Sequence, residues 1–353
     1  PLPINDRKEQ KESTDKNKIT FEKEIIVDVT ISNPTLQAKK KVEVEIMKAI
    51  HEHVDQKADV KVNVTAVAPP VTPLKPEKPK VPGIQNIIAI ASGKGGVGKS
   101  TITANMAVSL QKMGFKVGIL DADVYGPSIH LMFDVATARP LSVEIDGRSK
   151  MQPVESYGVK ILSLGFFTDA NQAVIWRGAM ASKALNQMIF DAHWGELDFL
   201  LIDLPPGTGD IHLSIVQAVP VTGAVIVSTP QNIALADAKK GVAMFQQENI
   251  NVPVLGIVEN MSFHLCPECG HKEHPFGTHG GSKIAERYNV PLLGALPLNI
   301  NIRESMDNGA PSVVKEPDSE VSGIYREIAR KLGAQLALQQ VKSTVSISIS
   351  DDE

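Results

Sequence analysis

Short apolar runs recur along the chain from residue 87 onward, and the segments between most of them place apolar residues at helical spacing. Continuous apolar runs of this length predict strands that are buried on both faces of a parallel sheet. The runs are IIAIA (87–91), KVGIL (116–120), VKILSL (159–164), FLLID (199–203), GAVIVST (223–229), VLGIVEN (254–260) and PLLGALP (291–297). Helical spacing is found over 102–113, 180–192, 234–248, 281–288 and 319–338. This alternation predicts an α/β domain over residues 87–338, with a doubly wound, mostly parallel sheet.

A different pattern occupies residues 19–67. Residues 21–31 are rich in β-branched side chains, residues 38–53 place apolar side chains at helical spacing, and residues 60–67 alternate strictly between polar and apolar. This order predicts a small α+β domain made of a strand, a helix and a second strand. A unit of about 50 residues is marginal as an independent domain, because it buries little of its surface.

The segments outside these two domains are polar or rich in proline. Residues 1–18 hold few apolar side chains and predict a disordered leader. Residues 68–86 predict an extended linker, because each proline fixes φ and removes a hydrogen-bond donor. Residues 339–353 form a polar tail without an evident strand partner.

Composition and charge narrow the classes of partner. The chain of 353 residues is 42% apolar and 22% charged, with a net charge of −4, which is typical of a globular protein. This balance provides no global basic field, so we expect neither nucleic acid nor membrane as a partner. No apolar run reaches the roughly 18 residues of a membrane-spanning helix, and the first residues lack the apolar core of a signal peptide. We therefore expect a cytoplasmic protein.

Residues 93–100 read GKGGVGKS and match the phosphate-binding pattern G-x-x-x-x-G-K-[ST], between a predicted strand and a predicted helix. Glycines allow successive backbone N–H groups to surround phosphate oxygens, and the following helix presents its positive N-terminus. Lys99 is placed to reach the β- and γ-phosphates of ATP, and the Ser100 hydroxyl is placed to bind Mg²⁺. The nucleotide-binding residues predicted here are Gly93, Lys94, Gly95, Gly96, Val97, Gly98, Lys99, Ser100 and Thr101.

Acidic residues follow two of the predicted strands at the sheet edge beside this loop. Asp121 and Asp123 come directly after the second apolar run, and Asp203 ends the fourth. A carboxylate at this edge can orient or deprotonate the attacking water, or hold Mg²⁺. We expect Asp123 to be catalytic and Asp203 to belong to the Mg²⁺ shell. The segment PPGTGD (205–210), which ends in Asp210, predicts a switch loop that responds to a γ-phosphate.

The chain has only two cysteines, Cys266 and Cys269, in the spacing C-x-x-C. This spacing lets two thiolates bind one metal ion or cluster, and three alternatives stay open. A redox dithiol is typical of a helix N-terminus, whereas Pro267 and Gly270 predict a loop here. A structural zinc site could close within one chain by adding two of the nearby histidines His271, His274 and His279. An iron–sulfur cluster prefers four thiolates and would therefore need two copies of the chain.

Lys94 is not required by the phosphate-binding pattern. The segment KGGVGKST (94–101) nevertheless resembles the deviant Walker A motif of the family that contains MinD, ParA and the nitrogenase iron protein. In that family the first lysine reaches the partner's phosphates in a nucleotide-sandwich dimer. The resemblance therefore implies that Lys94 is catalytic together with Lys99 and Asp123.

Five motifs in order resemble the Mrp/ApbC branch of P-loop NTPases, namely GKGGVGKST, LDADVYGPS, LIDLPPGTGD, VENMSFHLCPECG and GALPLNINIRE. The resemblance covers about residues 87–330. It implies an ATP-hydrolysing carrier that holds a [4Fe-4S] cluster at Cys266 and Cys269 across a homodimer. Scaffold proteins and apo iron–sulfur proteins are its implied partners, and Asn260 and Pro297 are implied to flank the adenine.

Residues 19–67 resemble the small iron–sulfur-assembly domain that many bacterial members of this branch carry at the N-terminus. Where that domain has a Thr-Pro-x-Cys-Pro region, this chain reads SNPTLQAKK (32–40), without cysteine. The resemblance therefore implies packing or docking for this domain and no thiol chemistry.

A positioning ATPase of the MinD or ParA kind, with a structural zinc at the C-x-x-C, is the alternative function. MinD-type members bind membrane through a basic amphipathic helix at a terminus, whereas this chain ends in the polar segment VKSTVSISISDDE. ParA-type members need a basic surface for DNA, which the net charge does not favour.

Overall fold

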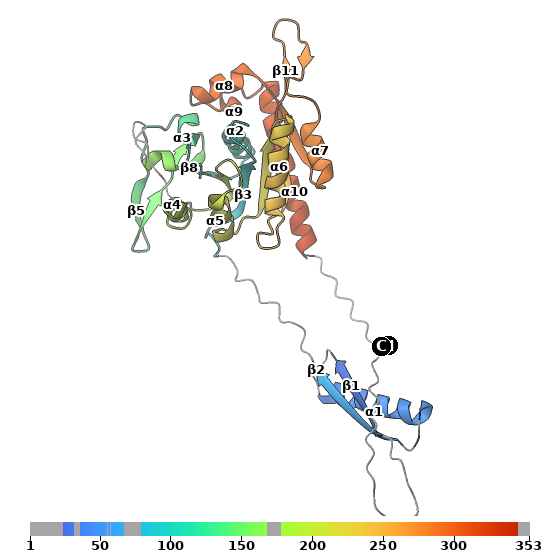
Figure 1. Ribbon diagram of the computed structural model, residues 1–353. Coiled ribbons are helices and arrows are strands. Elements are labelled where there is room, and N and C mark those ends of the chain that lie inside the picture. The colour runs from blue at the N-terminus through green and yellow to red at the C-terminus, as the bar shows by residue number, and fades with distance from the viewer. Residues whose placement is uncertain are drawn as a thin grey trace, which may run out of the picture. The chain divides into compact units, whose positions relative to one another are not determined.

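The computed structural model describes residues 24–31, 36–54, 56, 58–66, 79–167 and 178–344. The predicted leader, residues 1–18, lies outside these ranges. The chain divides into an N-terminal unit, residues 1–77, and an α/β unit, residues 78–353 (Figure 1). Among the described helices, none is both long and apolar enough to cross a membrane.

The N-terminal unit contains two parallel strands joined by a helix. Strand β1 (Glu24–Ile31) pairs in register with β2 (Asp59–Ala66), and α1 (Leu36–His53) makes the crossover that a parallel pair requires. On the exposed face of the pair, Asn63 Nδ2 donates a hydrogen bond to Asp28 Oδ1 at 2.9 Å. The strands and the helix lie where the sequence predicts them. That the unit is an iron–sulfur-assembly domain stays a prediction.

A sheet of nine strands forms the centre of the α/β unit. In chain order these are β3 (Ile84–Ser92), β4 (Val117–Asp121), β7 (Val154–Ser156), β8 (Val159–Ser163), β9 (Leu197–Asp203), β10 (Gly223–Ser228), β11 (Val254–Leu265), β12 (Lys272–Glu273) and β13 (Leu292–Pro297). Their order in space is β12-β11-β10-β3-β9-β4-β8-β7, with β13 paired to β11. The inner strands are parallel, and β7 and β12 run antiparallel to their neighbours.

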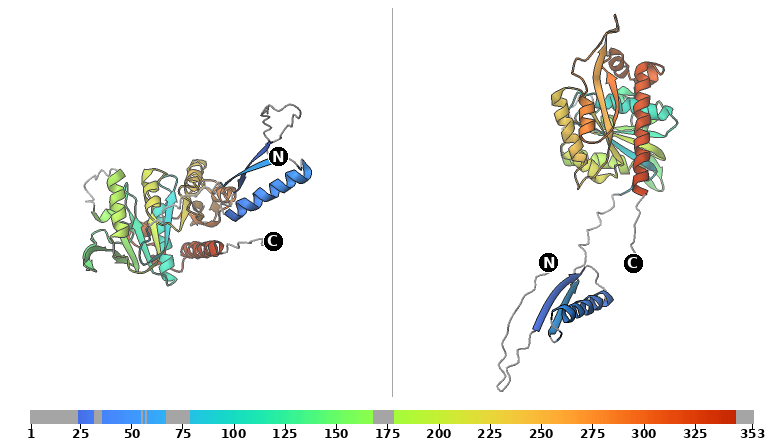
Figure 2. Two further views of the ribbon diagram at one scale, coloured as in Figure 1. Left: turned by 90° about the horizontal axis from the view of Figure 1, so that it is seen from below. Right: turned by 90° about the vertical axis from the view of Figure 1, so that its right-hand side faces the viewer.

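Helices cover both faces of this sheet (Figure 2). One face carries α4 (Gly178–Phe190), α5 (Asp210–Ala218), α6 (Asn232–Phe245) and α7 (Gly280–Arg287). The other face carries α2 (Lys99–Lys112), α3 (Ile129–Met132), α8 (Ile300–Asp307), α9 (Ser312–Lys315) and α10 (Glu320–Thr344). Side chains alternate along a strand, so Ile87 and Ala89 of β3 enter one apolar core and Ile88 and Ile90 enter the other.

The fold class predicted from the sequence is confirmed, because each of the seven apolar runs coincides with a strand of the sheet. The pattern missed short elements and elements with few buried positions. A separate antiparallel hairpin of β5 (Leu141–Ile145) and β6 (Arg148–Gln152) is mostly exposed, so its sequence lacks an apolar run. The edge strands β7 and β12 and the helices α3 and α9 have four residues or fewer, too few to establish a period, and the short helices α5 and α8 were missed as well.

Two domain boundaries differ from the prediction. Strand β3 begins at Ile84, inside the range predicted as linker (68–86), because its pairing with β9 starts before the apolar run. Helix α10 continues to Thr344, into the range predicted as polar tail (339–353). Leu, Ala, Gln and Lys favour a helix by intrinsic propensity, even where Leu338 is 55% exposed and burial no longer contributes.

Candidate functional site

The phosphate-binding loop connects β3 to α2 at the carboxyl edge of the sheet. Gly96 and Gly98 adopt φ values of 78° and 82°, in the left-handed region that glycine enters without strain. A Cβ on Gly93 would lie 2.2 Å from the backbone of Asp237 in α6, and one on Gly98 would lie 2.2 Å from Asn260 Nδ2. Backbone conformation and close packing therefore require these glycines. They place the loop at the N-terminus of α2, whose dipole favours an anion.

Lys99 and Asp203 form a buried ion pair at the start of α2. Lys99 Nζ lies 2.7 Å from Asp203 Oδ2, and the two side chains are 6% and 0% exposed. Asp203 also accepts hydrogen bonds from Ser100 Oγ at 2.6 Å and from Thr103 Oγ1 at 2.7 Å. The motif lysine, the motif serine and the aspartate that ends β9 are thus in direct contact. A phosphate entering the loop would compete with Asp203 for the lysine ammonium.

Asp121 anchors the loop that follows β4. Its buried carboxyl accepts hydrogen bonds from the backbone N–H groups of Ser128 and Ile129, at 3.0 and 3.1 Å, and from Ser163 Oγ at 2.8 Å. Burial, and next the charge of Asp203, raise the pKa of Asp121 to about 7. With its oxygens engaged in this way, Asp121 has a structural role beside the site.

Asp123 is the carboxylate of this loop that faces the motif lysine. Its Oδ2 lies 3.9 Å from Lys99 Nζ, and its side chain is 13% exposed. Its Oδ1 accepts hydrogen bonds from the backbone N–H groups of Tyr125 and Gly126, at 3.2 and 3.3 Å. Burial raises the pKa of Asp123, and the charge of Lys99 opposes this. A partly exposed carboxyl of raised pKa is suited to accept a proton from water beside the phosphate loop.

Two further segments contact the phosphate loop. Asn260 of β11 donates a hydrogen bond from Nδ2 to the Val97 carbonyl at 2.9 Å. In the predicted switch loop, the Gly207 N–H donates to the Ser92 carbonyl at 2.9 Å. The side chain of Asp210 lies outside what the structure describes. A movement of the phosphate loop would therefore change the hydrogen bonds that connect it to β11 and to the switch loop.

The oxygen donors beside the loop fit a Mg²⁺ ion. Ser100 Oγ and Asp203 Oδ2 lie 2.6 Å apart, and Asp123 Oδ2 lies 3.9 Å from Lys99 Nζ. Mg²⁺ prefers such hard oxygen ligands and completes its shell with water and substrate phosphates. The residues present therefore suit the ion that accompanies a nucleoside triphosphate.

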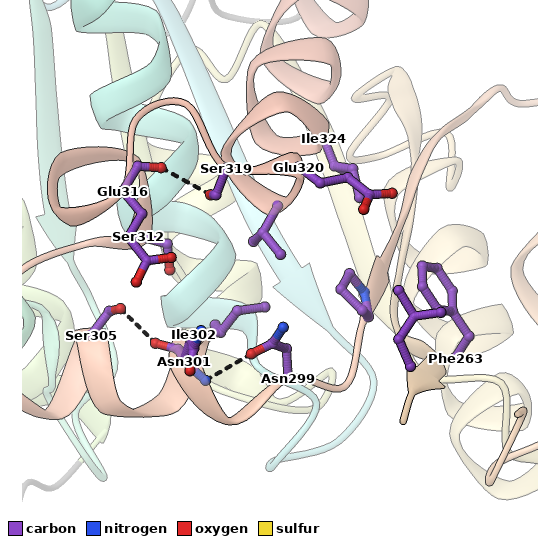
Figure 3. A pocket seen from close by; sticks show the side chains of 13 residues that line it. Phe263, Asn299, Asn301, Ile302, Ser305, Ser312, Glu316, Ser319, Glu320 and Ile324 are labelled. Atoms are coloured by element: carbon purple, nitrogen blue, oxygen red, sulfur yellow. Dashed lines mark hydrogen bonds between the residues drawn. The ribbon is translucent and has the colours of Figure 1, made fainter. Parts of the chain in front are cut away.

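A cavity of about 180 Å³ lies between the ends of β11 and β13 and the helices α8, α9 and α10. Phe263 and Pro297 provide apolar wall, whereas Asn299, Asn301 and Glu320 provide amide and carboxylate groups. Figure 3 shows the two asparagines on one side of the cavity and the glutamate on the other. Helix α8, which forms part of the wall, packs against α2. The cavity is thus next to the helix that begins at the phosphate loop.

The two cysteines lie at the tip of a hairpin that extends from the sheet. Strand β11 continues past its parallel neighbours and pairs antiparallel with β12. Figures 1 and 2 show the hairpin projecting from the rest of the α/β unit. The Cys266 N–H donates to the His271 carbonyl and the Gly270 N–H donates to the Cys266 carbonyl, both at 2.9 Å. Cys266 is half-buried and Cys269 is exposed.

Hydrogen bonds to the sulfur favour the thiolate form of Cys266. Backbone N–H groups, first that of Cys269 and then that of Glu268, donate to its sulfur and lower the pKa of Cys266. The thiolate is the form of cysteine that binds metal. This loop geometry also differs from the helix N-terminus at which a redox dithiol is typically found.

The zinc site that the sequence left open does not form among the described residues. They contain no group of three or more His, Cys, Asp and Glu side chains able to hold a metal ion. His274 Nδ1 instead lies 2.8 Å from the Ser262 carbonyl, and His279 is the residue before α7. A zinc site closed within one chain by the cysteines and two histidines is therefore not supported.

Sequence reasoning missed two residues of the site. Thr103 lies one helical turn after Lys99 and donates to Asp203, so a hydroxyl four positions beyond the motif lysine was the available signal. His212 of α5 is 1% exposed, and its Nε2 has no hydrogen-bond partner among the described residues. Burial, and next the charge of Lys99, lower the pKa of His212 to about 4. No local pattern distinguishes this histidine from one that faces solvent.

Residues 83–333 match a family model of the ParA type that is described as NUBPL iron-transfer P-loop NTPase. An iron–sulfur cluster carrier protein of Salmonella typhimurium is 54% identical over 256 residues, which cover 72% of this chain and 68% of the relative. An iron–sulfur cluster carrier protein of Deinococcus radiodurans is 42% identical over 317 residues, covering 89% of this chain and 86% of the relative. That match is longer than the α/β unit and so extends into the N-terminal unit.

Two solved structures share the fold of the α/β unit. A nucleotide-binding protein from Archaeoglobus fulgidus in complex with ADP is 38% identical, with a TM-score of 0.59 over 68% of this chain and 92% of that one. The cell division ATPase MinD of Pyrococcus furiosus is 24% identical, with a TM-score of 0.52 over 70% of this chain and 98% of that one. At that identity the second likeness shows the fold alone. The family suggested by the five motifs is confirmed by these comparisons.

Proposed function

The chain belongs to the ParA-type iron-transfer P-loop NTPases, and from this membership and the site we propose that it is an ATP-dependent iron–sulfur cluster carrier. It binds Mg²⁺-ATP at residues 93–100 and hydrolyses it slowly, with Asp123 accepting the proton of the attacking water. It holds a [4Fe-4S] cluster at Cys266 and Cys269 across a homodimer. Scaffold proteins supply the cluster, and apo-proteins receive it.

The observation that carries the proposal is the exposed pair of thiols on the hairpin. Backbone N–H groups favour the thiolate of Cys266, and Cys269 is open to solvent. An all-thiolate [4Fe-4S] cluster takes four cysteines, and the chain has two. Two copies therefore supply one complete ligand set. A cluster held at an exposed tip remains accessible to a recipient protein.

Strand β11 connects this tip to the nucleotide site. Asn260 in β11 contacts the phosphate loop, Phe263 lines the cavity, and the strand ends directly before Cys266. Nucleotide binding that moves the Val97 carbonyl would change its hydrogen bond with Asn260, on the strand that leads to the hairpin. This continuity supports a coupling between nucleotide state and cluster release.

The remaining parts of the nucleotide have candidate positions. The cavity beside α2 offers an apolar wall with amide groups, which suits a flat heteroaromatic base, and Pro297 belongs to that wall. Asn260 lies on the neighbouring strand, on the side of the phosphate loop. Lys94, half-buried in the loop, reaches the phosphates bound by the partner copy.

The proposed partners are proteins, with no role for nucleic acid or membrane. The N-terminal unit holds no cysteine and serves as a docking module for scaffold or recipient proteins. The cytoplasm is the proposed location, because unpaired thiols persist in a reducing compartment.

Two variants test the proposal with one assay, the transfer of a reconstituted cluster to an apo-enzyme that needs it. Lys99→Ala should retain the cluster but lose ATP affinity and any effect of ATP on transfer. The double variant Cys266→Ala/Cys269→Ala should bind ATP normally and hold no iron. ATP-dependent transfer by Lys99→Ala at the wild-type rate would contradict the proposed coupling.

A further inference from the structure

One face of the cysteine hairpin forms part of the cavity wall. Side chains alternate along β11, so Phe263 and Leu265 point to the same side, and both line the cavity. Figure 3 shows the Phe263 side chain at the cavity. Leu265 pairs with Lys272 of β12, which places Lys272 on this face too, diagonally opposite Phe263. The register of the hairpin thus brings a lysine of the returning strand to an aromatic residue of the cavity wall.

The ammonium of Lys272 lies over the ring of Phe263. Lys272 Nζ is 3.9 Å from the ring centroid, well within the range of a cation–π contact, although the lysine side chain as a whole is exposed. The His274 ring contacts Phe263 edge-on, with 6.4 Å between the two centroids. The Phe263 side chain therefore connects the strand that leads to Cys266 with the segment that follows Cys269.

The backbone of Phe263 is held in place, so a ligand in the cavity acts on its ring. The Leu298 N–H donates to the Phe263 carbonyl at 2.7 Å and ties this residue to the end of β13. A flat base bound in the cavity would add contacts to the ring on the cavity side and restrict its motion.

We propose that Phe263 is a positioning residue, which transmits occupation of the cavity to the cysteine loop through Lys272. The inference rests on the proposed function, in which the cavity takes the base of ATP. A base that restricts the Phe263 ring also keeps the Lys272 ammonium on it, so the two strands below Cys266 and Cys269 are held together more tightly. The carrier then retains its cluster while ATP is bound, and loss of the nucleotide loosens the loop for release.

This connection differs from the hydrogen bond between Asn260 and the phosphate loop. Asn260 contacts the Val97 carbonyl and would respond to the phosphates, whereas Phe263 would respond to the base. Magnesium tripolyphosphate has the phosphates and no base. It therefore separates the two connections in an experiment.

The thiols of the cluster-free protein report on the hairpin without iron. The chain has two cysteines, Cys266 and Cys269, so the rate of alkylation by iodoacetamide measures how firmly their loop is held. Lys272→Met removes the charge and keeps an apolar stem, whereas Lys272→Arg keeps a cation for the ring. Lys283→Met is the matched control, because Lys283 is an exposed lysine on α7, outside the hairpin. The ratio of rates with and without ligand is compared for each protein, which cancels any direct effect of the lysine charge on the thiols.

A non-hydrolysable ATP analogue with Mg²⁺ should slow the alkylation of wild type, Lys272→Arg and Lys283→Met. In Lys272→Met the analogue should bind with wild-type affinity, but the slowing should be smaller by about two- to fivefold, the factor expected for an exposed cation–π contact. Magnesium tripolyphosphate should bind without slowing the alkylation of any of these proteins.

Three results would overturn the inference: no slowing of wild type by the bound analogue, slowing of Lys272→Met equal to that of wild type, or equal slowing by tripolyphosphate. None of them depends on iron. The carrier function fails by a different result, a reconstituted wild type that transfers no cluster to an apo-enzyme.

Discussion

The buried carboxyl of Asp121 makes the stability of the fold depend on pH. Burial and the charge of Asp203 raise its pKa from 3.8 to about 7. Between these values the native state holds a proton that the unfolded state has lost, so the free energy of unfolding falls as pH rises. This one group changes the free energy of unfolding by about −1.4 kcal/mol per pH unit. Between the two pKa values the free energy of unfolding therefore falls by roughly 4 kcal/mol.

Asp121→Asn isolates this contribution. The asparagine has nearly the same shape and does not ionise, and its oxygen can still accept the hydrogen bonds from Ser128, Ile129 and Ser163. Urea unfolding of both proteins at several pH values between about 4 and 8 gives the free energy of unfolding of each. The stability of the variant relative to wild type should increase with pH and level off above about 7. A difference that stays constant across this range would refute the reasoning.

Three further predictions follow from the site. Asp203→Ala removes the partner that lies 2.7 Å from the Lys99 ammonium, whose side chain is 6% exposed, and should lower the free energy of unfolding in urea by roughly 3–5 kcal/mol. A decrease below about 1 kcal/mol would contradict a buried ion pair. Gly98→Ala should abolish ATP binding, because Gly98 has a φ of 82° and a Cβ there would lie 2.2 Å from Asn260 Nδ2. The control Gly114→Ala has a φ of 94° with open space around it, so it should cost only roughly 1–2 kcal/mol of stability and leave ATP binding intact. Equal ATP affinities of the two variants would argue against the close packing at Gly98. The pKa of His212 is lowered to about 4, so between about pH 4 and 6.5 this side chain binds a proton only in the unfolded state. The free energy of unfolding should therefore rise with pH in this range, and His212→Leu should remove that rise in the same urea titration.

The residues of the phosphate loop could be predicted from sequence because their types and spacing carry the chemistry directly. Gly98 is needed for a left-handed backbone, and Lys99 is needed for charge. The contact between Lys99 and Asp203 could not be predicted in this way. It arises because β3 and β9 are neighbours in the sheet although they lie far apart in the chain. Local patterns reveal the strands, whereas their order in space depends on packing of the whole domain.

The cysteine hairpin also could not be predicted from local sequence patterns. The predicted strand ended at Asn260, because the apolar run stops there. In the structure β11 continues to Leu265, stabilised by pairing with β12 beyond the C-x-x-C turn. That pairing is visible only in three dimensions. It turns two cysteines in a predicted loop into the tip of a projecting hairpin.

The shared cluster is tested most directly by iron content and molar mass of the same anaerobic sample. After reconstitution with iron and sulfide, the account predicts about two irons per chain in a dimer, together with visible absorption that is lost in Cys266→Ala/Cys269→Ala. ATP affinity measured on both proteins shows that the variant remains folded. One tightly bound metal ion per chain in a monomeric wild type would contradict the account.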